Sequence, residues 1–339
     1  KPTNLYPAGS AEAVALADSN ARRRIILDDG STLQNPNPIP YIGADNTLRA
    51  GDTVAGVTGI IDYGLATSST AGGSDYKIHP TITPVFSRDN PRTAAPASVG
   101  GNVKIASFNV LNYFTTFTNG ETASGQTGQG CTLDASTSAA NCRGASNLAE
   151  FIRQRDKIVA AIKAIDADVV GLMEIQNNGN TALQNLVDSL NAAMGAGTYA
   201  PVALPAGGTG TDAIRVAMIY KPGKLSPVGG AVSDTDAIHN RPPLAQTFSA
   251  PNGEQFSVVV NHFKSKGSCP VSGDPNADQG DGQGCWNALR VQQSQALLNF
   301  VNARSASAGD NDVLVIGDLN AYGKEDPILA LTTNGLVDE

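Results

Sequence analysis

Two oxygen-bearing side chains follow an apolar segment in the last part of this 339-residue chain. The segment Val313–Ile316 is short and rich in β-branched residues, which favours a buried strand over a helix, and Gly317 marks its end. Asp318 and Asn320 follow two residues apart, so both are expected on one face. Because Mg²⁺ and Ca²⁺ prefer oxygen ligands, the pattern indicates cation or phosphate chemistry. An Asx turn that only closes the strand is the alternative.

Three other predicted strands also carry polar residues at or near their ends: Asn109 in residues 104–112, Glu174 in residues 168–174, and His262, Lys264 and Lys266 in residues 256–266. Each alone has an ordinary explanation, such as a hydrogen-bonded core amide, a solvated strand terminus or a satisfied histidine. Four such strands in one chain favour a shared functional site over four separate coincidences.

In order and spacing, these segments resemble the endonuclease/exonuclease/phosphatase superfamily. The matching segments are Phe108–Val110, the strand that ends at Glu174, residues 261–266 and residues 317–320. As a set the four motifs are specific, although no single one is. Within the superfamily the chain is most similar to bacterial secreted nucleases, which share a similar Asn-His-Phe-Lys-Ser-Lys block and a cysteine-bearing loop. The similarity extends over residues 102 to 339.

The resemblance implies a metal-dependent phosphodiester hydrolase. Glu174 is the expected metal ligand, and Asn109 is expected to orient the metal shell or the phosphate. Mg²⁺ is the expected cation, with Mn²⁺ and Ca²⁺ as alternatives, because such ions bind few carboxylates and keep water ligands. His262 is the expected general acid/base or phosphate donor, since imidazole titrates near neutral pH.

The other expected roles concern water and phosphate. Asp318 is expected to orient the nucleophilic water or His262, and Asn320 to donate to a phosphate oxygen. Arg241 matches the family's phosphate-contacting arginine, although a surface salt bridge explains it equally well. Lys264 is the better of two lysine candidates for holding the substrate backbone, the alternative being a solvated strand tip.

Asp212 and Arg215 lie where many family members place a tyrosine and an acidic partner of the histidine. This departure from the family pattern leaves their roles open. Motifs of other enzyme classes are absent: the sequence has no G-x-S-x-G elbow, no Walker lysine in residues 207–211, no H-E-x-x-H and no Rossmann fingerprint.

Charge and cysteine content limit the function further. The net charge of −8 argues against a DNA-coating protein, because non-specific binding depends on Lys and Arg that neutralise phosphates. A nuclease whose basic residues are confined to one cleft is compatible with it. Two local cysteine pairs, Cys131 with Cys142 and Cys269 with Cys285, lack the C-x-x-C spacing of zinc sites. We therefore expect two disulfides and a secreted, extracellular or periplasmic location, with no membrane span.

Two domains are expected. Residues 1–98 combine short β-like segments with turn clusters and look like a small all-β, OB-like module. Its stacking candidates for single strands or oligosaccharides are Tyr41, Tyr63 and Tyr76, and a purely structural role is as good an explanation.

Residues 99–339 mix helical and strand patterns, which indicates an α/β (α+β) domain. Three helices are predicted by apolar spacing, over residues 147–165, 181–194 and 287–303. The resemblance implies that these helices cover two packed sheets in a four-layer α/β/β/α sandwich. This catalytic domain is expected to be C-terminally incomplete, because the family places a further Asp-His pair on a strand well after the G-D-x-N strand.

The sequence therefore predicts a secreted, metal-dependent endonuclease that hydrolyses DNA, or RNA, with little sequence specificity. The expected partners are the nucleic acid and the chain's own missing C-terminal segment, without which an apolar sheet edge is exposed; otherwise a monomer is expected. A phosphatase or lipid phosphodiesterase of the same fold is the alternative, because the matched residues contact phosphate rather than base or lipid. A non-catalytic binding or adhesion protein is the second alternative.

Overall fold

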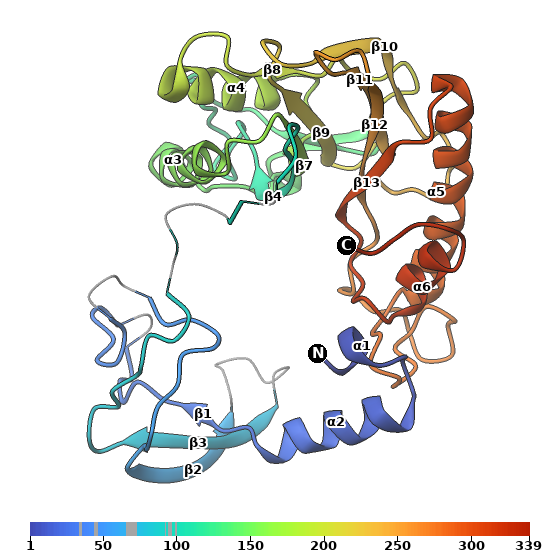
Figure 1. The fold of residues 1–339 in the computed structure, drawn as a ribbon. Helices are drawn as coiled ribbons and strands as arrows, with labels where there is room; N and C mark the ends of the chain where they lie inside the picture. The colour runs from blue at the N-terminus through green and yellow to red at the C-terminus, as the bar shows by residue number, and fades with distance from the viewer. Residues whose placement is uncertain (34–35, 44–46, 66–72, 92, 94–96, 99) are drawn as a thin grey trace. The chain divides into compact units, whose positions relative to one another are not determined.

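The computed structural model describes residues 1–33, 36–43, 47–65, 73–91, 93, 97–98 and 100–339 (Figure 1). The chain forms two compact units, one of residues 14–94 and one that joins residues 1–13 to residues 95–339. The first thirteen residues thus group with the larger unit, whereas the sequence analysis placed them in the N-terminal module. A domain boundary near residue 98 remains a prediction.

The smaller unit contains a three-stranded sheet. Its order is β1 (Ile26–Leu27), β3 (Ser74–Pro80) and β2 (Gly59–Leu65). Tyr63 and Tyr76 are cross-strand partners on β2 and β3, and both rings are exposed. An OB fold is a five-stranded barrel, and the described residues form only three strands here, so the OB-like expectation is not confirmed.

Two four-stranded sheets form the centre of the larger unit. In the first the order is β4 (Ile105–Tyr113), β7 (Val169–Gln176), β9 (Ile214–Tyr220) and β8 (Ala200–Pro201). In the second it is β10 (Ser226–Ser233), β11 (Leu244–Ser249), β12 (Gln255–His262) and β13 (Val313–Asp318). The pairs β4–β7 and β12–β13 are parallel, so the carboxyl ends of each pair lie at the same edge.

The longer helices of this unit cover the outer faces of the sheets (Figure 1). They are α3 (Leu148–Ile165), α4 (Thr181–Met194) and α5 (Asn287–Ala308). The same unit also contains two short helices, α1 (Pro2–Leu5) and α6 (Asp326–Thr332). Helix α2 (Ala11–Arg22) continues into the smaller unit. Asn147 caps α3, where its side chain accepts a hydrogen bond from the backbone N–H of Glu150. Among the described helices, none is long and apolar enough to cross a membrane.

Three apolar cores separate four layers. Helices α3 and α4 pack on the first sheet, the two sheets pack on each other, and α5 and α6 pack on the second sheet. Between the sheets, Val169 and Met218 of the first sheet belong to the same cluster as Phe248 and Val260 of the second. The structure therefore has the expected mixed α/β fold, with helices outside two facing sheets.

Both expected disulfides are present. Cys131, on β5 (Cys131–Leu133), is bonded to Cys142, just after the hairpin with β6 (Ser136–Ser138) and the 3₁₀ turn Ala139–Asn141. Cys269 is bonded to Cys285, just before α5. The first bond lies next to Gln176, the last residue of β7, and the second lies next to Lys266, which follows β12.

Packing of the two sheets requires a glycine at position 171 of β7. A Cβ atom there would lie 2.6 Å from Cδ1 of Ile316 and 2.8 Å from Cγ2 of Val260, both on the facing sheet. We predict that Gly171→Ala lowers the free energy of unfolding by about 1–3 kcal/mol through overpacking, as measured by urea denaturation. Gly223→Ala is the control, because a Cβ atom at that position meets no atom within 4 Å. Equal stability of the two variants would contradict the close packing of the sheets.

Candidate active site

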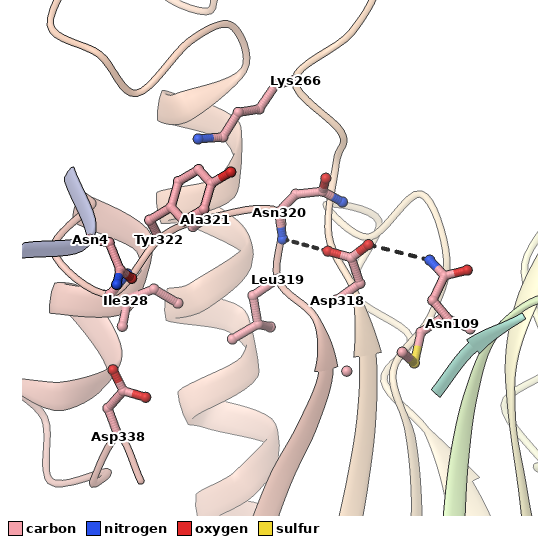
Figure 2. Close-up of a pocket in the computed structure, with 13 residues that line it drawn as sticks. Asn4, Asn109, Lys266, Asp318, Leu319, Asn320, Ala321, Tyr322, Ile328 and Asp338 are labelled. Atoms are coloured by element: carbon pink, nitrogen blue, oxygen red, sulfur yellow. Dashed lines mark hydrogen bonds between the residues drawn. The ribbon is translucent and has the colours of Figure 1, made fainter. Parts of the chain in front are cut away.

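The four polar strand ends meet in one cluster. The Asn109 Nδ2 group of β4 donates to Glu174 Oε1 of β7 at 2.9 Å and to Asp318 Oδ2 of β13 at 3.4 Å. His262, the last residue of β12, has Nε2 at 3.9 Å from the same Asp318 oxygen. Figure 2 shows the Asn109 amide pointing at Asp318. These side chains from both sheets therefore lie close together, and their function as a shared site remains a prediction.

Irregular backbone aims these side chains. Glu174 (φ 68°), Asn112 (φ 52°) and Asn320 (φ 49°) have left-handed backbone, which is rare for residues other than glycine. The pairing of β4 with β7 shifts register after Asn109, and that of β7 with β9 shifts around Glu174. Such bulges turn a side chain away from its regular position, and strained backbone of this kind is concentrated at functional sites.

The two carboxylates are held in place by shared hydrogen-bond donors. Glu174 Oε2 accepts from the Asn112 backbone N–H at 2.8 Å, and its Oε1 shares the Asn109 amide nitrogen with Asp318. Asn109 Oδ1 accepts from the Leu111 N–H at 2.9 Å, so this amide orients the carboxylates. The described residues contain no group of three or more His, Cys, Asp or Glu that could hold a metal ion. Mg²⁺ needs only one or two carboxylates, since it keeps several waters, and Glu174 with Asp318 fits that requirement.

His262 is neutral at neutral pH. Its side chain is 5% exposed, and burial together with the positive charge of Arg241 lowers its pKa to about 4, against the opposing effect of Asp318 and Asp212. Among the described residues its buried Nδ1 atom has no hydrogen-bond partner. A neutral imidazole beside a carboxylate is suited to accept a proton as a general base.

Arg241 is built into the protein rather than exposed. Its side chain is 8% exposed; Nε donates to the His262 carbonyl at 3.2 Å, Nη2 to the Phe263 carbonyl at 2.6 Å and Nη1 to Asp212 Oδ2 at 3.1 Å. Burial lowers its pKa. These contacts fix the end of β12 and the backbone of His262. The surface salt bridge considered from the sequence is thus a buried one, and contact of Arg241 with phosphate remains a prediction.

The two residues with open roles have different surroundings. Asp212 accepts from Arg241 and also pairs through Oδ1 with Arg143 Nη1 at 3.2 Å. Arg215 is buried and donates to the carbonyls of Gly179 at 2.9 Å and Val216 at 3.1 Å, so it supports a loop. The sequence analysis did not identify Arg143, because only the folded loop brings it to Asp212.

The Asx turn considered as the alternative explanation of the Asp318 and Asn320 pattern is present. The Asp318 Oδ1 atom accepts a hydrogen bond from the backbone N–H of Asn320 at 3.0 Å. The Asn320 Nδ2 group donates to the Phe263 carbonyl at 3.1 Å. The turn and the cluster are thus compatible, because the turn fixes the Asp318 carboxylate next to Asn109. Donation from Asn320 to a phosphate remains a prediction.

The two lysines that follow β12 differ in their partners. Lys266 pairs with the fully buried Glu325 at 2.6 Å and lies above the ring of Tyr322 (Figure 2), which gives it a structural partner. Lys264 has its Nζ atom 4.7 Å from the centroid of the Trp286 ring. Its expected role in holding the substrate backbone remains a prediction.

A cavity of about 690 Å³ adjoins the cluster (Figure 2). Asn109, Asp318 and Asn320 line it together with Tyr322 and Asn4. Asn4 lies near the start of the chain, and its side chain accepts a hydrogen bond from the backbone N–H of Gly323. The sequence alone could not place Asn4 at this site, because more than 300 residues separate it from Gly323. A substrate could reach the Asp318 carboxylate through this cavity.

Comparisons with known proteins agree with this architecture. The model of the endonuclease/exonuclease/phosphatase family matches residues 106–338. A search of curated proteins found no match. Among solved structures, the family protein from Bacteroides vulgatus is 15% identical, with a TM-score of 0.41 and coverage of 69% of this chain and 72% of that one.

Two structures from Bacteroides thetaiotaomicron are also similar. The mannosyl-6-phosphatase is 14% identical, with a TM-score of 0.41 and coverage of 69% of this chain and 71% of that one. A family protein is 15% identical, with a TM-score of 0.36 and coverage of 54% of this chain; the chain spans only 60% of that protein. The match of the family model to most of the larger unit shows that this chain belongs to the endonuclease/exonuclease/phosphatase family.

Proposed function

We propose that this chain is the catalytic part of a secreted phosphodiesterase that uses a divalent cation to hydrolyse DNA, or RNA, with little sequence specificity. The supporting observation is the convergence of Glu174, Asp318 and His262 around the Asn109 amide. Enzymes of this family hydrolyse phosphoester bonds and generally depend on divalent metals. The two disulfides are compatible with an oxidising compartment outside the cytoplasm.

Each side chain of the cluster has a proposed task. Glu174 and Asp318 would hold the cation, with Mg²⁺ as the proposed ion, and Asn109 orients both carboxylates. When bound, the cation supplies positive charge that stabilises the phosphoryl oxygens. His262 accepts a proton from the attacking water, and the adjacent Asp318 carboxylate stabilises the resulting imidazolium.

The choice of DNA rests on the charges beside the cluster. The chain as a whole carries −8, yet Arg143 and Arg241 share the Asp212 carboxylate, and Arg241 donates to the carbonyl of Phe263, the residue before Lys264. A local group of cations in an acidic protein suits a polyanionic substrate that binds at one place. Hydrolysis of a phosphomonoester or a lipid phosphodiester by the same residues is the alternative, which the substrate assay below separates.

The first test is cation-dependent cleavage of plasmid DNA. We expect a preparation that contains the complete catalytic domain to nick and degrade plasmid in Mg²⁺, Mn²⁺ or Ca²⁺ and to lose this activity in EDTA. Agarose gels measure the loss of supercoiled DNA, and p-nitrophenyl phosphate measures monoesterase activity in parallel. Full cleavage in excess EDTA would refute the metal requirement, and activity on the monoester alone would establish the phosphatase alternative.

The second test separates metal binding from proton transfer. We expect Glu174→Gln to weaken Mn²⁺ binding, measured by calorimetry, because one anionic ligand is lost. We expect His262→Ala to lower kcat by roughly 10²–10⁴-fold while Mn²⁺ affinity is kept. Glu254→Gln, at an exposed turn before β12, is the control for the loss of one carboxylate. Equal loss of metal affinity in the Glu174 and His262 variants would show that these roles are wrongly divided.

The low pKa of His262 also predicts how stability depends on pH. In the unfolded chain this imidazole takes up a proton near its ordinary pKa of 6.5, whereas in the folded protein it does so only near 4. Its contribution is therefore complete above pH 6.5 and is lost as the pH falls towards 4, by on the order of 3 kcal/mol. Urea denaturation at pH 7 and pH 4.5 should show a smaller loss in His262→Asn than in the wild type.

The control for this experiment is His239→Asn, because burial also lowers the pKa of His239, whose Nε2 atom lies 3.0 Å from Asp234. Because His239 is still present in His262→Asn, the free energy of unfolding of that variant should still fall with pH by the contribution of His239. The same loss of stability in His262→Asn and wild type would mean that His262 is protonated normally in the folded protein.

A further inference from the structure

Two side chains beside the active site have no part in the proposed chemistry, and each directly follows a disulfide cysteine. Arg143 follows Cys142, and Trp286 follows Cys285. The disulfides thus fix both residues in loops that otherwise have little regular structure. The two loops come from different parts of the chain: the Trp286 ring lies at Lys264, and Arg143 is linked through Asp212 and Arg241 to Phe263, the residue before Lys264.

Arg143 presents an exposed guanidinium that is linked to His262 through Asp212 and Arg241. Its side chain is 40% exposed, and a single ion pair, with Asp212 Oδ1, holds it at 3.2 Å. The other oxygen of Asp212 is taken by the buried Arg241, which in turn holds the His262 carbonyl. Because two guanidinium groups share one carboxylate, net positive charge remains. Arginine has five N–H donors, so Arg143 keeps donors for a phosphate.

Trp286 presents an aromatic ring that is fixed at its edge. Its Nε1–H group lies 3.0 Å from the Gly267 carbonyl and 3.1 Å from the Ser268 carbonyl, so the indole edge is bound to the loop. The backbone of Trp286 is left-handed (φ 65°), a conformation that non-glycine residues keep only where the surroundings enforce it. On either side of this residue the backbone is bound: the fully buried Arg290 donates to the Cys285 carbonyl at 2.8 Å, and the Trp286 N–H donates to the Asn276 carbonyl at 2.7 Å.

Lys264 connects the two residues. Its ammonium lies over the Trp286 ring, 4.7 Å from the centroid. Burial lowers the pKa of Lys264, as do the charges of Arg241 and Arg143. Cations that repel one another in this way are relieved when an anion binds between them. An aromatic ring beside such a pair of cations is the combination that binds the base and the backbone of a single-stranded nucleic acid.

We propose that Arg143, Lys264 and Trp286 form a nucleotide subsite next to the His262 centre. In it Arg143 and Lys264 bind a phosphate that neighbours the one to be cleaved, and Trp286 stacks on the attached base. The inference rests on the proposed nuclease function and refines its substrate. Because a base must leave the double helix to stack on the indole, the enzyme prefers single-stranded or frayed DNA.

Trp286 is the only tryptophan of the chain, so its fluorescence reports directly on this subsite. In EDTA, which prevents cleavage, a short thymidine oligonucleotide should quench the fluorescence, whereas an abasic oligonucleotide of equal length and inorganic phosphate should quench it far less. Anisotropy of labelled oligonucleotides then gives Kd for the variants. We expect Trp286→Ala to weaken binding of the thymidine oligonucleotide roughly 5- to 150-fold and to leave abasic binding unchanged.

Two further variants distinguish stacking and charge from folding defects. Trp286→Phe keeps a ring and should restore most of the affinity that Trp286→Ala loses. Arg143→Gln should weaken both oligonucleotides, whereas Arg155→Gln, on the outer helix α3, should weaken neither. Equal affinity for thymidine and abasic oligonucleotides in the wild type would overturn the subsite, as would unchanged binding in Trp286→Ala.

Cleavage assays keep this result apart from the proposed function. Base-dependent binding without any DNA cleavage in Mg²⁺ would support the subsite and overturn the nuclease assignment. DNA cleavage that is equally fast on single-stranded and double-stranded substrate, in wild type and in Trp286→Ala alike, would support the nuclease and overturn the subsite.

Discussion

The contact of one amide with two carboxylates joins the halves of this fold. Asn109 and Glu174 belong to the first sheet and Asp318 to the second, so the site exists only when the sheets are packed face to face. Gly171 allows this approach, because the side chains of Ile316 and Val260 occupy the space beside its Cα. The apolar core between the sheets therefore stabilises an arrangement in which two anionic groups lie close together, which is unfavourable unless positive charge compensates for it.

Between His262 and the protein surface, positively and negatively charged side chains follow one another. His262 is buried and neutral, and Arg241 next to it is buried and positively charged. Asp212 partly neutralises Arg241 and holds the exposed Arg143 in place. Two ion pairs, Arg241–Asp212 and Asp212–Arg143, thus connect the backbone of His262 to the surface. Arg241 also donates to the backbone carbonyls of His262 and Phe263. A substitution at Asp212 should therefore change both the position of His262 and the charge at the surface.

The sequence predicted those parts of the site that depend on local pattern. The apolar segments that end in Glu174, His262 and Asp318 are strands, and their common edge follows from parallel pairing. Asn147 caps α3, and α4 covers residues 181–194 as the apolar spacing indicated. Strand β10 was not predicted, because most of its residues are exposed and no alternation of polarity marks them.

Long-range contacts were beyond such prediction. Glu325 accepts from Thr3 at 2.9 Å and pairs with Lys266, and no local pattern links these three residues. The pairing changes the interpretation of Lys266 from a free cation to a structural one. In the same way the burial of Arg241 and the position of Arg143 depend on the folded loops. Residue types indicated which side chains could bind phosphate, but only their partners show which of them keep free donors.

The distribution of charge is compatible with the proposed binding of a polyanion by an acidic protein. A net charge of −8 repels nucleic acid over most of the surface, so the proposed binding would be favourable only where the cations near His262 outweigh it. Few phosphates are then neutralised, and affinity should depend less steeply on salt than in a protein that coats DNA. Contacts to phosphate carry no sequence information, and stacking tolerates any base. The proposed low sequence specificity would therefore follow from the same few residues that confine binding to one place.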